Sequence, residues 1–403
     1  MVLHGSRETR LDVFRHEPDL DLDGYRPLPE HVETEADRRS RIGFGDALPA
    51  LALYAVVRAV GVYVLWAWGA SRDKALVDLL GRSWDSNWFL AIAQSGYDYG
   101  DTERSNLAFF PLYPLLLKGT DTVLPLDGAE AGILVAWLAA LAAAWGLFAV
   151  GTHVHDRRTG IMLAVLWGVI PHGITQSMAY TEGLFTALAA WALYAVLARQ
   201  WLVAGVLCLV AGLSRPTASA LIGAVCLAAL VALIRRRDGW RPAFALLVGP
   251  LGWLAYLAWV GQRVGRPDAW FQIQGEQWGT TFDGGFYTFN KAREVLSRAS
   301  ELENYVVTFV LLVAVALFVM SLIDRQPWPL LVYSALMLIT SLGGENYYHS
   351  KARYIVPAFA LLLPAAVGLS RAHLGKAVVT LTTVCLVSAF MGGYLLLVWK
   401  HSP

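Results

Sequence analysis

The strongest candidate for chemistry is the carboxylate of Asp85, in the stretch RSWDSNWFLAI at residues 82–92. If this stretch is helical, Trp88, Phe89 and Ile92 follow at i+3, i+4 and i+7 and form an apolar stripe beside the carboxylate. Apolar surroundings desolvate a carboxylate and raise its pKa, which suits a general base that takes a proton from a hydroxyl group. The alternative is a helix cap, in which Asp85 accepts hydrogen bonds from the next turn.

A second motif, NLAFFPLYP at residues 106–114, combines aromatic residues with two prolines. Pro111 and Pro114 are three residues apart and cannot both lie inside an unbroken helix. The pattern predicts a re-entrant segment that folds back on a bilayer. A simple interfacial helix without substrate contact is the alternative.

A second acidic candidate, Glu182, lies in the stretch MAYTEGLF at residues 178–185. It stands where an apolar run begins. It can be a first-turn acid that the helix dipole stabilises, with Thr181 as the cap. It can also be a carboxylate that binds sugar hydroxyls or orients a cation.

Cationic residues supply the third element of the pattern. Arg215 lies in LSRPT at 213–217, between two apolar runs, where an ionisable group is costly and points to function unless it snorkels to the interface. The stretch ENYYHSKARY at 345–354 adds His349, Lys351 and Arg353. Such a cluster is expected to grip an anionic phosphate, or else to contact lipid headgroups.

The composition shows what must position these residues. Of the 403 residues, 56% are hydrophobic and 16% are charged, against roughly 25% charged in soluble domains. Several apolar runs are long enough for a membrane helix, which takes about 20 residues. The sequence predicts an all-α polytopic membrane protein with about 11 transmembrane helices, at 47–70, 130–151, 161–178, 181–199, 201–214, 216–234, 243–261, 303–323, 328–342, 353–370 and 375–399.

Basic residues in short connections predict the orientation, because such residues favour the cytoplasmic side. With eleven spans they fall on one side, together with a polar arm, 1–46, that is expected to be disordered and cytoplasmic. Residues 47–403 then form a single transmembrane domain. The long connections 71–129 and 262–302 lie on the outer side, and the first carries the catalytic carboxylate.

Other classes of function find no support in the sequence. A net charge of +1 without a basic stripe gives no reason to expect a nucleic-acid partner. GxGxxG, HExxH and CxxC motifs are absent, and the cysteines at 208, 226 and 385 lie in apolar runs as small core residues. No cofactor is expected. A carboxylate opposite outer-leaflet cations, with aromatic residues between them, instead suits a lipid-phosphate-linked sugar donor.

The ordered motifs around Asp85, Tyr113, Glu182, Arg215 and Arg353 resemble those of PIG-V-type mannosyltransferases, which are membrane glycosyltransferases of the GT-C fold. The resemblance runs from about residue 80 to 370. It implies a polyprenyl-phosphate or dolichyl-phosphate mannose donor, inverting transfer, and Asp85 as the catalytic base in the first extracytoplasmic loop. Members of this fold often carry two close acids there. In this loop Asp98, Asp101 and Glu103 lie near Asp85, but none of them has the spacing of an Asp-X-Asp, which leaves a divalent-metal requirement open.

The resulting hypothesis is a bacterial plasma-membrane enzyme that transfers mannose from a polyprenyl-phosphate donor to a glycolipid, glycan or protein acceptor. The donor phosphate is assigned to Arg353, Lys351, Arg215 and His349, and the sugar or acceptor site to Trp84, Trp88, Tyr113, Tyr180 and Glu182. Three alternatives stay open at this stage. One is a related enzyme that transfers glucose, arabinose or aminoarabinose, and another is a lipid or sugar transporter. The third is a non-catalytic membrane scaffold that has kept the fold.

Overall fold

A computed structural model describes residues 43–97 and 103–403. The predicted arm at 1–46 therefore lies almost entirely outside the described residues. Within the described ranges the chain is helical, and its β pairing is a single isolated bridge between Phe282 and Gly344. The predicted all-α class is confirmed.

The helices follow one another through short connections. The α-helices are α2 (Phe44–Ala70), α3 (Leu76–Gly81), α4 (Asp85–Ser95), α5 (Leu112–Val123), α6 (Gly128–Val154), α7 (Arg157–Gly168), α8 (Glu182–Leu197), α9 (Trp201–Gly212), α10 (Ala218–Ile234), α11 (Arg241–Val248), α12 (Leu251–Val264), α13 (Ala269–Gln272), α14 (Phe286–Ser297), α15 (Leu302–Ile323), α16 (Trp328–Leu342), α17 (Lys351–Tyr354), α18 (Leu363–Arg371) and α19 (Leu374–Leu397). Shorter helical turns are η1 (Asn106–Ala108), η2 (Gly173–Ser177), η3 (Ile273–Gln277), η4 (Tyr348–Ser350) and η5 (Phe359–Leu362).

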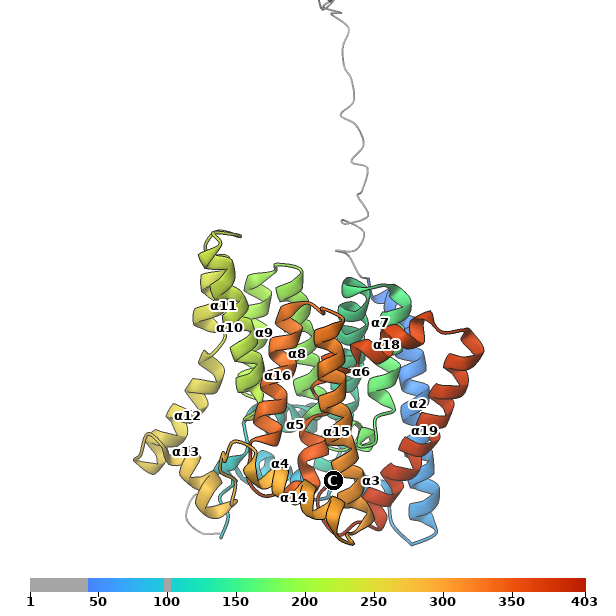
Figure 1. Cartoon of the computed structure of the whole chain (residues 1–403). Helices are drawn as coiled ribbons and strands as arrows, with labels where there is room; N and C mark the ends of the chain where they lie inside the picture. Colours follow the sequence, from blue (N-terminus) through green and yellow to red (C-terminus); the bar gives the residue numbers. More distant parts are fainter. Residues whose placement is uncertain (1–42, 98–102) are drawn as a thin grey trace, which may run out of the picture.

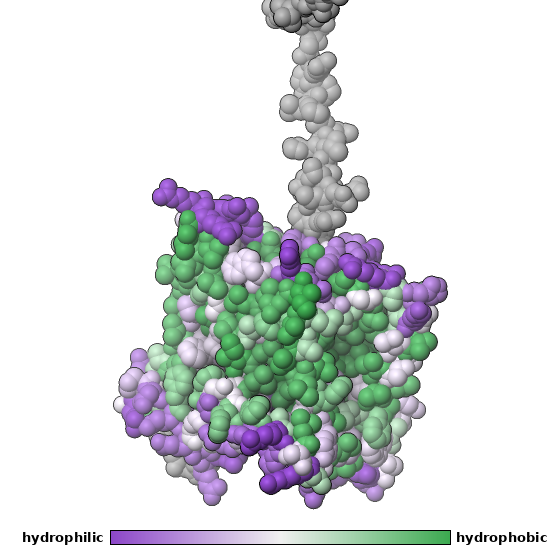
Figure 2. Space-filling model, in the orientation of Figure 1, coloured by the Kyte–Doolittle hydropathy of each residue, from purple (hydrophilic) through white to green (hydrophobic). Residues whose placement is uncertain are grey.

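The long helices stand side by side, while α3, α4 and α14 lie at the lower end of the molecule in Figure 1. An apolar band separates polar surfaces at the two ends in Figure 2. Five helices or continuous helix pairs are long and apolar enough to cross a membrane: α2, α6, α11–α12, α15 and α19. The chain is a multi-pass membrane protein.

The predicted count of eleven spans is not confirmed. Each predicted apolar run meets a helix or a broken helix. However, α8, α9, α10 and α16 are short apolar helices, and α7 ends at Gly168 in the middle of its run. The pair α17 and η5–α18 is bent by 74°, and it makes a sixth crossing if both halves are counted as one span. Helix length therefore supports five or six full crossings in the described chain.

Small residues let the helices of the core approach closely. A Cβ atom at Gly151 of α6 would lie 2.7 Å from the Cα atom of Gly160 in α7. The facing surface of α6 is rich in alanine, with Ala143 and Ala144 fully buried. Lipid supplies no hydrophobic force between such helices, so close van der Waals packing holds them together.

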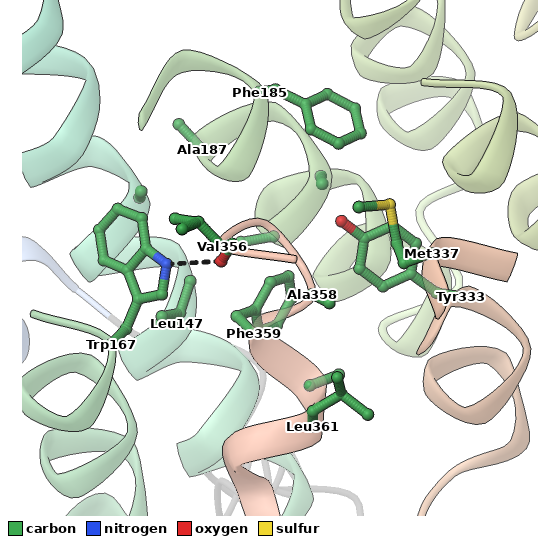
Figure 3. Packing of buried hydrophobic residues seen from close by; sticks show 14 of the residues in the cluster. Leu147, Trp167, Phe185, Ala187, Tyr333, Met337, Val356, Ala358, Phe359 and Leu361 are labelled. Carbon is green, nitrogen blue, oxygen red and sulfur yellow. Dashed lines mark hydrogen bonds between the residues drawn. The ribbon is translucent and has the colours of Figure 1, made fainter. Parts of the chain in front are cut away.

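Two helices break inside the bundle, and side chains satisfy the backbone groups that the breaks release. After α7 the chain continues irregularly through 169–181, and it breaks again at 355–358 between α17 and η5. The Trp167 indole donates to the Val356 carbonyl at 3.0 Å, as Figure 3 shows. The Tyr333 hydroxyl donates to the Pro357 carbonyl at 2.9 Å. Irregular backbone at membrane depth needs such partners, because lipid offers none.

A buried arginine fixes the first break. Arg58 in the middle of α2 is 3% exposed and donates to Ser177 Oγ at 2.9 Å and to the Gly168 carbonyl at 3.1 Å. Tyr54, one turn earlier, donates to Gln176 Oε1 at 2.9 Å. Helix α2 thereby fixes the irregular segment that leads to Tyr180 and Glu182.

The close contact between α9 and α12 gives a direct test of this packing. A Cβ atom at Gly252 would overlap the Leu209 carbonyl oxygen, whereas one at Gly368 in α18 would meet no neighbour within 4 Å. We expect Gly252→Ala to destabilise the protein by about 1–3 kcal/mol, because the backbones of α9 and α12 must move apart to make room for the methyl group. Gly368→Ala is the matched control and should be neutral or slightly stabilising. Thermal unfolding in detergent measures both, and equal melting temperatures would contradict the predicted contact.

Candidate active site

An ion pair joins a residue of the first sequence motif to a residue of the last. Nη1 of Arg353 lies 2.7 Å from Oδ2 of Asp85. Asp85 is the first residue of α4, and the side chain of the preceding Trp84 forms no capping hydrogen bond. Trp84 has φ 50°, a value that few residues other than glycine adopt, so the turn into α4 is sharp. The carboxylate is thus presented to Arg353 at the beginning of the helix.

Glu182 lies between two arginines. Its Oε1 atom is 3.3 Å from Nη1 of Arg215 and 3.7 Å from Nε of Arg353. All three side chains are less than 10% exposed, whereas the Asp85 side chain is 28% exposed. We call these four residues the charge cluster, and Asp85 is its most accessible member.

Aromatic rings surround the guanidinium groups of the cluster. The Arg353 guanidinium carbon lies 5.0 Å from the ring centre of Tyr180 and 5.3 Å from that of Tyr354. Arg215 lies 5.9 Å from the ring centre of Phe185. Ring faces carry negative potential, so they help to stabilise buried cations.

The arginines keep donor atoms that no acceptor among the described residues satisfies. The Nη1 atoms contact carboxylates, Asp85 for Arg353 and Glu182 for Arg215. The Nε atoms of both arginines are buried without a hydrogen bond among the described residues. Buried polar atoms in folded proteins are nearly always bonded, so such donors call for another partner. Two buried guanidinium groups with free donors are well suited to an anionic ligand.

Exposed salt bridges anchor the loop that carries Asp85. Arg82 contacts Asp78 at 2.6 Å and Asp127, the N-cap of α6, at 2.7 Å. Backbone N–H groups of α6, with help from Arg82, hold the pKa of Asp127 below its ordinary value. Because these side chains are about half exposed, each ion pair contributes at most about 1 kcal/mol to the free energy of unfolding. Their contribution is to orient the turn into α4.

The second long connection closes one side of α4 with an aromatic wall that the individual motifs did not predict. The ring centre of Trp278 lies 5.2 Å from that of Trp88 and 5.2 Å from that of Phe109. The Trp278 indole also donates to the Ser105 carbonyl at 3.1 Å. In the sequence, the signal for this wall was that 262–302 is longer and richer in aromatic residues than a simple connection requires.

Several predicted site residues have other partners. The Lys351 ammonium group donates to the carbonyls of Gly344 at 2.6 Å and Ser341 at 3.2 Å. His349 stacks on His401, with ring centres 5.0 Å apart. Tyr113 is fully buried, and its hydroxyl donates to the Gly132 carbonyl at 2.7 Å. Their roles in phosphate or sugar binding stay predictions.

The acids near Asp85 do not form a metal centre in the described part of the chain. Within residues 43–97 and 103–403, no three His, Cys, Asp or Glu side chains are grouped so that they could hold a metal ion. Asp98 and Asp101 lie outside the described residues. The metal requirement therefore remains open.

Residues 70–234 match the family model described as Mannosyltransferase (PIG-V). The match covers under half of the chain and includes Asp85, Glu182 and Arg215, so the resemblance inferred from the motifs is confirmed over this part. The Lys351–Tyr354 helix lies outside it. No curated protein sequence matches the chain.

Two solved structures have similar backbones. ArnT from Cupriavidus metallidurans, bound to undecaprenyl phosphate, is 14% identical with a TM-score of 0.54, over 82% of this chain and 63% of ArnT. The apo oligosaccharyltransferase of Archaeoglobus fulgidus is 13% identical with a TM-score of 0.47, over 86% of this chain and 56% of that protein. The chain thus spans less than two thirds of either protein. The likeness to ArnT shows the GT-C fold, and with the family match it supports a membrane glycosyltransferase.

The charge cluster predicts non-additive stability. Glu182→Ala leaves two buried arginines beside each other, and Arg215→Ala leaves Glu182 with a single, more distant arginine. Breaking a buried pair in this way costs about 3–5 kcal/mol. We expect the double variant to be less destabilised than the sum of the two single variants, because it removes both charges together. Thermal unfolding in detergent provides the measurement, and strictly additive effects would show that the pair is not coupled.

Proposed function

We propose that this protein is an inverting glycosyltransferase that transfers mannose from a polyprenyl-phosphate donor at the outer face of the membrane. The observation that carries the proposal is the contact between Asp85 and Arg353 beside the buried pair of Glu182 and Arg215. It brings a partly exposed carboxylate next to one of two buried guanidinium groups whose Nε donors have no hydrogen-bond partner among the described residues. A base and an anion-binding group in one place are what sugar transfer from a phosphate requires.

The reaction follows from these positions. Asp85 takes the proton of the acceptor hydroxyl, whose oxygen attacks the anomeric carbon of the sugar. The bond from that carbon to the phosphate oxygen breaks, and attack from the opposite face inverts the configuration. Arg353 and Arg215 stabilise the negative charge that develops on the leaving phosphate.

The ion pair between Asp85 and Arg353 gives donor binding a second effect. While Arg353 contacts Asp85, the carboxylate is engaged by a cation at 2.7 Å. A bound phosphate competes for the same guanidinium group. Donor binding therefore releases Asp85 from the ion pair. The carboxylate becomes free to accept a proton only once the donor phosphate is bound.

The distribution of basic residues supports the orientation. Arg157 donates to the Asp46 carbonyl at the start of α2, and Arg158 donates to the Ala372 carbonyl. These contacts gather basic connections at the end of the bundle opposite α3 and α4, as Figure 1 shows for the helices. By the bias of basic loops, we assign that end to the cytoplasm and the charge cluster to the extracytoplasmic side.

The donor class has support from fold and family. ArnT, which shares the fold, is seen with undecaprenyl phosphate, and the matching family model is that of a mannosyltransferase. Another polyprenyl-phosphate sugar, such as glucose or arabinose, is the competing donor. The acceptor, whether glycolipid, glycan or protein, is not distinguished by these residues.

Asp85→Asn tests the central role. We expect the variant to fold and to lose about 10²–10⁴-fold in transfer of labelled mannose from polyprenyl-phosphate mannose, because the amide cannot take the proton. Asp121→Asn in α5, an exposed acid of the same connection, is the matched control and should keep wild-type activity. Transfer at the wild-type rate by Asp85→Asn would refute the assignment. Uptake of sugar into vesicles without a glycosylated product would favour a transporter.

A further inference from the structure

The helix that carries Arg353 is too short to fix its own position. Helix α17 has four residues, Lys351–Tyr354, and irregular backbone follows it at 355–358. In a helix of a single turn, most backbone donors and acceptors have no partner within the helix. The position of the Arg353 guanidinium group therefore depends on contacts between α17 and its neighbours.

Ser341, in the last turn of α16, contacts both ends of α17. Its carbonyl oxygen accepts a hydrogen bond from the Lys351 ammonium group at 3.2 Å, and its hydroxyl group donates to the Tyr354 carbonyl at 3.3 Å. Arg353 lies between the two residues that Ser341 contacts. We call Ser341, Lys351 and Tyr354 the α17 clip.

The Lys351 side chain is enclosed by the elements around the end of α16. It is 1% exposed, and its ammonium group also donates to the Gly344 carbonyl at 2.6 Å. The ring centre of Tyr287 in α14 lies 5.9 Å from the ammonium nitrogen. Carbonyl groups at the C-terminal end of a helix carry negative partial charge, so they stabilise a cation there. The ammonium group is thus bound to the end of α16.

This direction turns Lys351 away from the role of a phosphate ligand. The carboxylates of the charge cluster, Asp85 and Glu182, are paired with arginines. To reach a phosphate beside them, the ammonium group would have to give up two charge-assisted hydrogen bonds, which are among the stronger kind. Two buried carbonyl groups would then lose their donor.

The charge cluster needs α17 to be held accurately. Nη1 of Arg353 lies 2.7 Å from Asp85, and its Nε atom lies 3.7 Å from Glu182. A displacement of about 1 Å can cost a catalytic group about 10²-fold in rate. The bonds to the Val356 and Pro357 carbonyls, made by side chains that Figure 3 shows, hold the break after α17. The α17 clip supplies the restraint on the helix itself.

We propose that Lys351 and Ser341 are positioning residues, which hold α17 against α16 so that the Arg353 guanidinium group faces Asp85 and the donor phosphate. Lys351 then acts through Arg353 and does not contact the phosphate, in contrast to the role expected from the sequence. The proposal rests on the proposed function for the identity of the anion.

Lys351→Met and Arg353→Gln, alone and together, test this role in full-length protein in nanodiscs. With polyprenyl-phosphate mannose as donor, we expect Lys351→Met to lower kcat by about 10- to 100-fold and to change KM by less than about threefold, because a misplaced guanidinium group stabilises the developing charge poorly. In the Arg353→Gln background, Lys351→Met should lower kcat by less than about twofold further. A further loss of about tenfold there would show that Lys351 contacts the phosphate itself, and would overturn the proposal.

Ser341→Ala keeps the test decisive if Lys351→Met does not fold. It removes the hydroxyl bond to Tyr354 and should lower kcat by about 3- to 10-fold, whereas Ser341→Thr keeps the hydroxyl group and should restore most of the activity. Thr340→Val is the matched control, because the Thr340 hydroxyl donates within α16, to the Leu336 carbonyl. Unchanged kcat in Ser341→Ala, or an equal loss in Thr340→Val, would overturn the proposal.

Stability separates this proposal from the proposed function. If Ser341 sets the ion pair between Arg353 and Asp85, Ser341→Ala and Asp85→Asn should be non-additive in thermal unfolding, whereas Thr340→Val and Asp85→Asn should add. If the protein transfers no sugar from any prenyl-phosphate donor but this coupling is present, the proposed function fails and the positioning role stands. If it transfers mannose while Ser341→Ala is additive and fully active, the positioning role fails and the enzyme assignment stands.

Discussion

The structure depends on burying two arginines within a membrane protein. Arg353 and Arg215 are each less than 10% exposed, in a region where an unpaired charge is costly. Glu182 lies near both and Asp85 contacts one, so two carboxylates face two guanidinium groups. The cluster is neutral overall, yet its geometry leaves donor atoms of both arginines without acceptors. The ion pairs hold the cluster together, and its unsatisfied donors are the groups that we propose bind an anion.

This arrangement requires the breaks in the helices. A continuous α7–η2 helix would carry Tyr180 and Glu182 away from Arg353, and a straight α17–α18 pair would change the position of Arg353 itself. Arg58, Trp167 and Tyr333 satisfy the backbone where the helices end. The same breaks also line an apolar groove against α15.

The sequence predicted those features that depend on residue type and order. Apolar length predicted the all-helical membrane class, and the misplaced charges of Asp85, Glu182, Arg215 and Arg353 identified the members of the cluster. Their pairing could not be predicted, because it depends on how far apart the helix ends lie. Apolar length likewise could not reveal that α7 stops at Gly168, so the count of eleven spans was not confirmed. Arg58 was passed over although a charge inside the predicted span 47–70 is itself a signal, because its partners Gly168 and Ser177 come close to it only in the folded chain. Tyr113 was assigned to the sugar site from its motif, but its hydroxyl has a backbone partner.

The most direct test of the central claim is a cryo-electron microscopy structure in nanodiscs with a non-hydrolysable phosphonate analogue of polyprenyl-phosphate mannose. The predicted result is phosphonate density between Arg353 and Arg215, with the anomeric carbon on the side of Asp85 and the contact between Asp85 and Arg353 broken. Analogue bound elsewhere, with that contact unchanged, would contradict a catalytic role for the cluster.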